Sequence, residues 1–267
     1  MIKVIVTGAL GRMGSAIIRL VVEQTDMELV SAVERKDHPG IGSDIGLLLG
    51  LRKEIGIPLL GDLEVSIDKG DVIIEFIEPR VTLHHLSIVS SHKKRMVIGT
   101  TGFTPKQLEG IKKISEDTPI VLSPNMSMGT NLMFKLVKEA ALILNGYDIE
   151  IIEAHHHHKK DSPSGTADRL AHILATALNR SLDEVGVYGR KGFVGERKRE
   201  EIGILSVRAG DIVGEHTVLF GGDGERLEIT HRVTSRNCFA KGAIQAARFI
   251  SDASPGLYDM GDVLGIR

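Results

Sequence analysis

Short β-branched runs alternate with helix-like stretches along the first half of the chain. Five runs predict strands: Lys3–Val6, Leu29–Val33, Val72–Phe76, Met96–Ile98 and Ile120–Leu122. After the first run, apolar residues recur at intervals of three and four from Met13 to Val21, the stripe of an amphipathic helix. Another helix is predicted to begin at Thr104, because Pro105 and Gln107 follow it at the positions of a capping box. This alternation favours a parallel sheet with helices on both faces.

The pattern changes near Asn125. Helices are predicted at Leu132–Leu144, Leu170–Leu178 and about Phe239–Ser251. Strands are predicted at Tyr147–Glu153, Ile202–Val207, Ile212–Phe220 and Arg226–Val233. The glycine-rich tetrapeptide Gly221–Gly224 separates the last two strands and is typical of a tight hairpin, which requires an antiparallel or mixed sheet. We therefore expect a second domain of α+β type, with Gly186–Glu201 as a surface loop. The last helix fits either domain.

Composition and charge narrow the class of protein. The hydrophobic fraction is 42% and the net charge is −2, so the chain can bury a core and lacks the basic surface of a nucleic-acid-binding protein. Its apolar runs, such as Ala140–Leu144, fall far short of the ~20 residues that span a membrane. The N-terminus has no signal-peptide pattern, and a lone cysteine, Cys238, excludes an internal disulfide. We expect a soluble, cytoplasmic protein that binds neither nucleic acid nor membrane.

A glycine-rich turn follows the first predicted strand and opens the first helix. Thr7–Gly14 contains glycines that would let the backbone approach a pyrophosphate, although their spacing is GxxGxxG and not GxGxxG. Glu34 ends the second strand about 20 residues on, where an acid that binds ribose belongs. A turn without a ligand is the alternative, but the context favours a dinucleotide.

The cofactor type follows from the next pair of residues. A carboxylate at Glu34 suits the ribose hydroxyls of NAD, whereas the guanidinium of Arg35 can pair with the 2′-phosphate of NADP. The pair predicts use of both NADH and NADPH, unless Arg35 is merely an exposed charge. Gly99–Gly102, read Gly-Thr-Thr-Gly, follows another strand and would lie at the same edge of the sheet, although that tetrapeptide alone is a weak signal.

Residues 153–166 read EAHHHHKKDSPSGT. Adjacent side chains on an extended segment point to opposite sides, and no second ligand pair is evident, so we predict no metal here. For His157 and His158 a solvated loop is the favoured interpretation. The following Pro-Ser-Gly-Thr leads into an apolar-periodic helix, with Ser164 or Thr166 as its cap, and such a helix start suits a carboxylate. A histidine and a lysine beside it can transfer protons and hold a second anionic group.

Several motifs together give the chain a resemblance to the dihydrodipicolinate reductase family. They are GALGRMG, the Glu-Arg pair at 34–35, IGTTGF, SPNMSMGTN, EAHHHHKKDSPSGTA and VRAGDIVGEHTV. The resemblance implies an α/β protein with an N-terminal Rossmann-type dinucleotide-binding domain, residues 1–126 and 238–267, and an α+β substrate-binding and tetramerisation domain, residues 127–237. It also implies the NADH- or NADPH-dependent reduction of 4-hydroxy-tetrahydrodipicolinate, a cyclic dicarboxylate of the diaminopimelate route to lysine, by a homotetramer.

The resemblance implies roles for particular residues. The catalytic pair would be His155 and Lys159, and the substrate-binding residues would be His156, Ser164, Gly165 and Thr166. The cofactor contacts would be Gly8, Ala9, Leu10, Gly11, Arg12, Met13, Glu34, Arg35, Gly99, Thr100, Thr101, Ser123, Pro124, Asn125 and Met126.

The chain departs from the family pattern at two places. Ser162 stands where the family often has alanine, and Glu75-Phe76-Ile77 stands where the family has a DFT-like segment near the cofactor cleft. Two other interpretations remain: a different two-domain Rossmann oxidoreductase, and a nucleotide sensor without activity.

Overall fold

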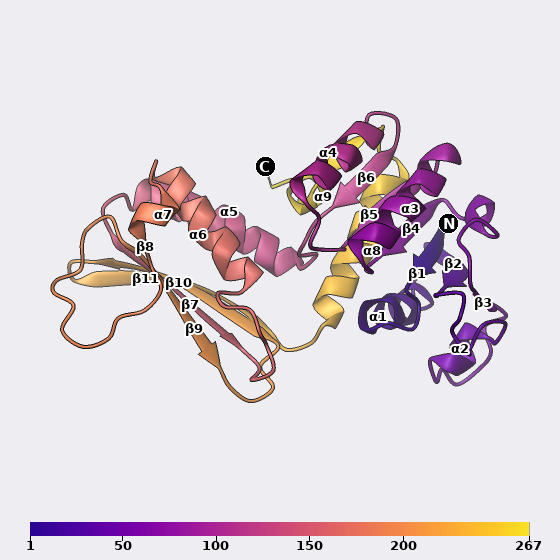
Figure 1. Cartoon of the computed structure of the whole chain (residues 1–267), viewed down its shortest axis with the longest axis horizontal. Coiled ribbons are helices and arrows are strands. Elements are labelled where there is room, and N and C mark those ends of the chain that lie inside the picture. The colour runs from indigo at the N-terminus through magenta and orange to yellow at the C-terminus, as the bar shows by residue number, and fades with distance from the viewer. Residues whose placement is uncertain (267) are drawn as a thin grey trace. The chain divides into compact units, whose positions relative to one another are not determined.

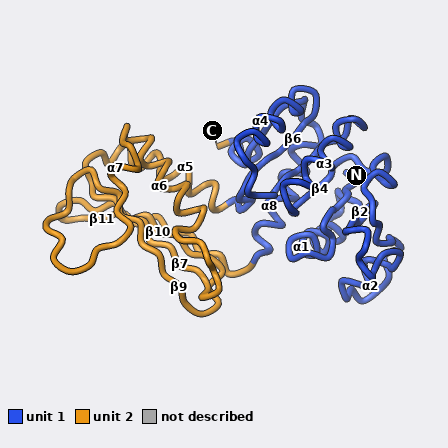
Figure 2. The backbone as a smooth tube through the Cα atoms, in the orientation of Figure 1, with its two compact units in different colours: residues 1–128, 236–265 blue, residues 129–235, 266–267 orange. Residues whose placement is uncertain are grey.

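The computed structural model describes residues 1–266 and divides them into two compact units (Figure 2). Unit 1 consists of Met1–Met128 and Arg236–Gly265, and unit 2 contains Gly129–Ser235. The chain thus leaves unit 1 once and returns to it through its last long helix. Among residues 1–266, no helix is both long enough and apolar enough to cross a membrane.

Seven parallel strands form the sheet of unit 1 within the described residues, in the order β12-β6-β5-β4-β1-β2-β3 (Figure 1). Their bounds are β1 Ile2–Thr7, β2 Met27–Val33, β3 Leu59–Leu60, β4 Val72–Glu75, β5 Arg95–Ile98, β6 Pro119–Leu122 and β12 Gly256–Tyr258. The helices are α1 Arg12–Val21, α2 Ile45–Leu48, the 3-10 turn η1 Ile67–Lys69, α3 Pro79–Ser91, α4 Pro105–Ile114, α8 Asn237–Ser251 and α9 Met260–Leu264.

Helices cover both faces of this sheet. Val4 and Val6 of β1 pack into a cluster with α1 and α8, whereas Ile5 between them packs into a second cluster with α3 and α4. Successive strand residues point to opposite faces, so a run that is apolar throughout is buried on both. The predicted parallel α/β sheet is confirmed. The capping box at Thr104 is present as well, since its side chain accepts from the Gln107 amide and the Gln107 side chain accepts in return.

Unit 2 is a mixed sheet with helices on one face. Within the described residues its strands lie in the order β11-β10-β7-β9-β8, with β10 antiparallel to β7 and β11 and the other pairs parallel. The strands are β7 Asp148–His155, β8 Gly186–Val187, β9 Ile202–Arg208, β10 Gly214–Gly222 and β11 Glu225–Val233. The helices are α5 Met128–Ile143, α6 Gly165–Ala177 and α7 Leu182–Val185.

The core of unit 2 lies between its sheet and the helices α5 and α6. Ile149 and Ile151 of β7 face this core together with Val218 and Phe220 of β10. Most predicted elements of unit 2 differ from the structure by a few residues at their ends, and two of these differences have a clear cause. Gly186 and Val187 are not loop but the short strand β8, because they add to the edge of β9. The strand predicted from Ile212 begins only at Gly214, since the carbonyl of Ile212 instead accepts from the amide of His156.

Candidate active site

The glycine turn of unit 1 leaves the backbone exposed to a ligand at the start of α1. Gly8 has φ +60°, and a side chain there would press against Ile77 at 2.6 Å. Gly14 packs so closely on the turn that a Cβ would lie 2.1 Å from the Gly8 carbonyl. The N-cap Gly11 has no side chain, so the first amides of α1 are left to an anion. The turn therefore fits a pyrophosphate despite its irregular glycine spacing.

Glu34 lies against this turn directly after β2. Its carboxylate accepts from the amides of Leu10 at 3.2 Å and Arg35 at 3.0 Å, which fixes the side chain beside the phosphate turn. A cavity of about 530 Å³ lies here and is lined by Gly8, Glu34 and Arg35 as predicted. Lys36 also lines it and was missed, although its position after Glu34-Arg35 was a signal. This end of the site fits the ribose of an adenosine.

The loops after β4, β5 and β6 form a second cavity, of about 280 Å³, in the same unit. Of the predicted cofactor residues, it contains Arg12, Met13, Gly99, Pro124, Asn125 and Met126. Phe76, Arg236 and Phe239 were not predicted and line it too. Phe76 lies so close to Gly99 that a Cβ on Gly99 would lie 2.0 Å from its ring. The departure Glu75-Phe76-Ile77 therefore borders this cavity.

Two other predicted residues, Thr100 and Ser123, hold these loops in place. The Thr100 hydroxyl is buried, accepts from the Ile77 amide at 3.1 Å and pairs with the Thr82 hydroxyl at 2.9 Å. Ser123 is also buried and donates to the Asn125 carbonyl at 2.9 Å. Thr101 is exposed. Within unit 1, the hydrogen bonds of Thr100 and Ser123 thus hold the loops at the carboxyl edge of the sheet.

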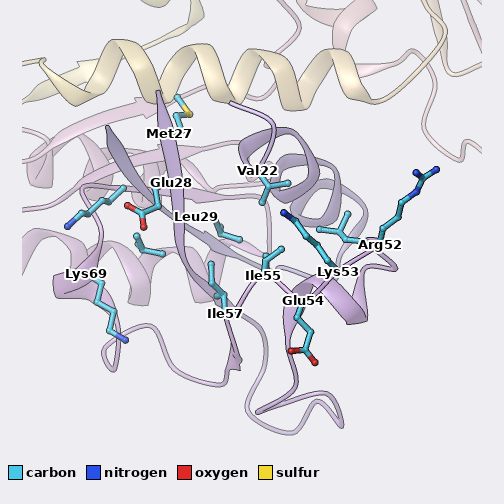
Figure 3. Close-up of a pocket in the computed structure, with 14 residues that line it drawn as sticks. Val22, Met27, Glu28, Leu29, Arg52, Lys53, Glu54, Ile55, Ile57 and Lys69 are labelled. Atoms are coloured by element: carbon cyan, nitrogen blue, oxygen red, sulfur yellow. The ribbon is translucent and has the colours of Figure 1, made fainter. Parts of the chain in front are cut away.

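A wider cavity of about 1280 Å³ lies elsewhere on unit 1 (Figure 3). Its lining comes from the starts of β1 and β2, such as Lys3 and Glu28, and from the segment that contains Lys53 and Ile57. The glycine turn follows the opposite ends of those strands. None of the predicted site residues lines this cavity, and its charges are of both signs, so size alone does not mark the active site.

The predicted catalytic residues lie at the end of β7 and in the turn after it. His155 is 9% exposed, and its Nδ1 lies 2.6 Å from an oxygen of Glu153. Lys159 contacts both carboxylate oxygens of Asp161 at 2.8 Å. His156 is partly buried, whereas His157 and His158 are exposed, with ring centres 3.9 Å apart and ring planes tilted by 57°. Among residues 1–266, no group of three histidine, cysteine or acidic side chains is placed to hold a metal.

Ser164, not Thr166, caps the helix α6. Its hydroxyl accepts from the Ala167 amide at 3.2 Å and shares a hydrogen bond of 2.9 Å with Nε2 of His216. Gly165 is exposed, and a Cβ built on it would meet no atom of the described residues within 4 Å. The backbone at Gly165, the first residue of α6, is thus approachable, as an anion site requires.

Sequence reasoning missed three residues beside His155: the buried Glu153 and His216, and the partly exposed Arg208. Arg208 forms a bidentate pair with Glu153, at 2.7 and 2.8 Å. Burial alone would raise the pKa of Glu153, but hydrogen bonds from Arg208 and His155 outweigh it and lower that pKa to about 2. Burial, together with the charge of His155, lowers the pKa of His216 to about 4. Glu153 is therefore ionised and His216 neutral at neutral pH.

Unit 1 combines a parallel sheet with a glycine turn and an acidic residue suited to a ribose. Unit 2 places a histidine and a lysine beside a helix start. Together these features define a two-domain oxidoreductase that uses a nicotinamide dinucleotide. The chain belongs to the dihydrodipicolinate reductase family. The family's N-terminal model matches residues 2–126 and its C-terminal model matches residues 129–264. Family membership makes the chain an NAD(P)H-dependent reductase and removes the two alternative interpretations, another Rossmann oxidoreductase and a sensor.

Similar proteins cover the whole chain. A 4-hydroxy-tetrahydrodipicolinate reductase from Syntrophus aciditrophicus is 53% identical over 100% of both chains, and one from Syntrophotalea carbinolica is 49% identical over the same share. A solved structure of dipicolinate-bound dihydrodipicolinate reductase from Paenisporosarcina sp. TG-14 superposes with a TM-score of 0.78. It is 29% identical to this chain and covers 97% of both chains.

Proposed function

We propose that the protein reduces 4-hydroxy-tetrahydrodipicolinate to tetrahydrodipicolinate in the diaminopimelate route to lysine. The observation that carries this proposal is the cluster in unit 2. There a single carboxylate, Glu153, contacts both His155 and the first residue before α6, Ser164. An acid–base group and a helix start suited to carboxylates therefore lie side by side, as reduction of a cyclic dicarboxylate requires.

The dinucleotide supplies a hydride to C4 of the ring when it is bound. In the same overall reaction the 4-hydroxyl group and one proton from C3 leave as water, and one proton returns to C3 when the hydride has reached C4. We assign that proton to His155, whose Nε2 is the nitrogen not engaged with Glu153. Lys159 would exchange its pairing with Asp161 for a substrate carboxylate. The amides and hydroxyl at Gly165 and Thr166, together with His156, would hold the second carboxylate.

Each unit takes one part of this chemistry in the proposal. Residues 1–126 and 238–267 would form the dinucleotide-binding domain, in which the turn from Gly8 to Met13 holds the pyrophosphate. Glu34 and Arg35 would read the ribose end, and the residues at 99–101 and 123–126 would line the nicotinamide end. Residues 127–237 would form the substrate-binding and oligomerisation domain. We place the enzyme in the cytoplasm, because its one cysteine and its nicotinamide substrate suit that compartment.

We further propose that the protein is a homotetramer assembled through unit 2. Helices α5 and α6 pack on one face of the five-stranded sheet, and the other face carries apolar side chains. Ile152 and Val207 on that face are 38% and 45% exposed, and Phe193 in the adjoining loop is fully exposed. Exposed apolar surface of this kind marks an interface. Light scattering during size exclusion should give the mass of four chains, and a monomer mass would contradict the proposal.

The assay of the proposed function follows NADPH oxidation with freshly generated substrate. Turnover that depends on both the substrate and NADPH or NADH is expected. Binding of NADPH without any oxidation in the presence of substrate would contradict the proposed reaction.

A further inference from the structure

Glu153 is a buried charge that the reaction itself does not use. Its side chain is 0% exposed. One carboxylate oxygen accepts from Nδ1 of His155 at 2.6 Å and from Arg208 at 2.8 Å. The other accepts from the Ser164 amide at 3.2 Å and from Arg208 at 2.7 Å. Each oxygen thus has two donors, and the Ser206 side chain donates to the carboxylate as well, so Glu153 is fully satisfied as an ionised carboxylate.

These contacts fix the proton of His155. An ionised carboxylate can only accept, so Nδ1 must carry the hydrogen that it donates to Glu153. In the neutral ring this leaves Nε2 without a proton and free to take one up and return it. Nε2 faces the backbone of Gly214, where a Cβ would lie 3.1 Å away. The missing side chain at Gly214 therefore leaves the working nitrogen unobstructed.

The same carboxylate also holds the loop that carries Lys159. Arg208, paired with Glu153, donates a further hydrogen bond of 2.7 Å to the backbone carbonyl of Asp161. Asp161 in turn holds Lys159, and Ser164 at the far end of the loop donates its amide to Glu153. Both ends of the segment from His155 to Ser164 are thus tied to one buried ion pair.

We propose that Glu153 is a positioning residue for proton transfer: it holds His155 in the Nδ1–H tautomer and, through Arg208, holds the loop of Lys159. This inference rests on the proposed function, because it assumes that His155 handles the proton. Nearby charged and titratable groups on the neighbouring strands and the following loop are Arg208, His216, His231, Lys159 and Asp161. His216 stays neutral near pH 7 and brings no competing charge to the pair.

The matched control is Glu150, three residues earlier on the same strand. Its carboxylate also forms a bidentate pair, with Arg190 at 2.9 and 3.0 Å, but its side chain points to the opposite face of β7. Glu150→Gln removes a carboxylate–arginine pair of the same kind without touching His155. In Glu153→Gln, by contrast, an amide N–H₂ must face a donor of Arg208, Ser164 or His155, so either the tautomer or the loop anchor is lost.

The test compares kcat and KM for Glu153→Gln, Glu153→Asp, Glu150→Gln and His155→Gln, together with ¹⁵N histidine spectra. Glu153→Gln is expected to lower kcat by about 10- to 100-fold, with NADPH affinity unchanged and a larger solvent isotope effect. Glu153→Asp should recover part of kcat because it restores the charge, and Glu150→Gln should leave kcat within about twofold. The wild-type spectrum should show His155 protonated at Nδ1 in its neutral form.

Three outcomes would overturn the inference and leave the proposed function untouched. They are normal kcat in a folded Glu153→Gln, an equal loss in Glu150→Gln, or a wild-type spectrum with His155 protonated at Nε2. The spectrum decides the matter even if Glu153→Gln does not fold. If His155→Gln loses kcat while Glu153→Gln keeps it, the role of Glu153 is refuted and the proposed function is not. Normal kcat in His155→Gln would instead refute the proton donor, and the inference with it.

Discussion

Arg35→Ala should separate the two cofactors. The guanidinium of Arg35 lies at the cavity beside Glu34, is 69% exposed and holds Asp37 only at 3.4 Å. An exposed ion pair of this kind is worth at most about 1 kcal/mol, so little opposes a turn of Arg35 toward a 2′-phosphate. NADPH carries that phosphate and NADH does not. Removal of the guanidinium should therefore weaken NADPH alone.

The size of the effect follows from the exposure of the side chain. A hydrogen bond to a charged group contributes about 1.5–3 kcal/mol, and an exposed one falls at the lower end. We expect about a 10- to 30-fold rise in the Kd of NADPH and less than about a threefold change for NADH. Lys36→Ala is the matched control, since Lys36 lines the same cavity but is already paired with Asp62 at 2.8 Å. Its effect on NADPH should be smaller.

Fluorescence titration of each variant with NADPH and NADH, at low and high salt, measures these constants. Wild-type affinity for NADPH should fall more steeply with salt than affinity for NADH, and Arg35→Ala should remove most of that difference. If Arg35→Ala weakens the binding of both cofactors equally, Arg35 does not bind the 2′-phosphate.

Three further predictions concern unit 2. His155→Gln and Lys159→Ala should each lower kcat by about 10²-fold with NADPH affinity unchanged. His157 is an exposed neighbour, so His157→Ala should have near-normal kcat. Normal kcat in either of the first two variants would show that the residue takes no part in the chemistry. Pyridine-2,6-dicarboxylate should inhibit competitively against substrate, and Thr166→Val and, more strongly, Gly165→Val should raise its inhibition constant; unchanged constants in both folded variants would place the carboxylates elsewhere. The pKa of His216 falls from 6.5 to about 4 on folding, because burial disfavours its charged form. The unfolded chain therefore binds this proton first, and stability should fall by up to about 3 kcal/mol as pH drops from about 6.5 to about 4. Urea unfolding should show a flatter pH dependence in His216→Asn, and an unchanged slope would contradict the assignment.

The sequence was most informative where the backbone itself restricts the residue type. The turn at Gly8 needs a positive φ, and Gly14 leaves no room for a Cβ, so both positions were readable as a phosphate turn. The capping box at Thr104 and the doubly buried strands carry equally local signals. In each of these cases, the residues that determine the local structure lie within a few positions of one another in the sequence.

The partners of His155 could not be found in this way because strand register brings them together. Arg208 lies opposite His155 through the parallel pairing of β7 with β9, and His216 lies opposite Glu153 through the antiparallel pairing with β10. A shift of either register by one residue would turn these side chains to the other face of the sheet. The motifs that contain Arg208 and His216 were visible, but not the strand on which they meet.

The position of the ion pair also explains why a costly group is retained in the core of unit 2. A buried carboxylate–arginine pair often contributes no more stability than apolar side chains of the same volume. Ile149 and Ile151 occupy the equivalent inward positions earlier on β7 and pack into the apolar core. The strand changes from apolar to charged inward residues only at Glu153, where an apolar side chain could not accept from Nδ1 of His155 or from the Ser164 amide. This change from apolar to charged inward residues coincides with the end of β7. There Arg208 is still partly exposed, so its charge is less costly to desolvate. His155 is therefore placed where the sheet supplies a buried acceptor for Nδ1, while Nε2 is not engaged with Glu153.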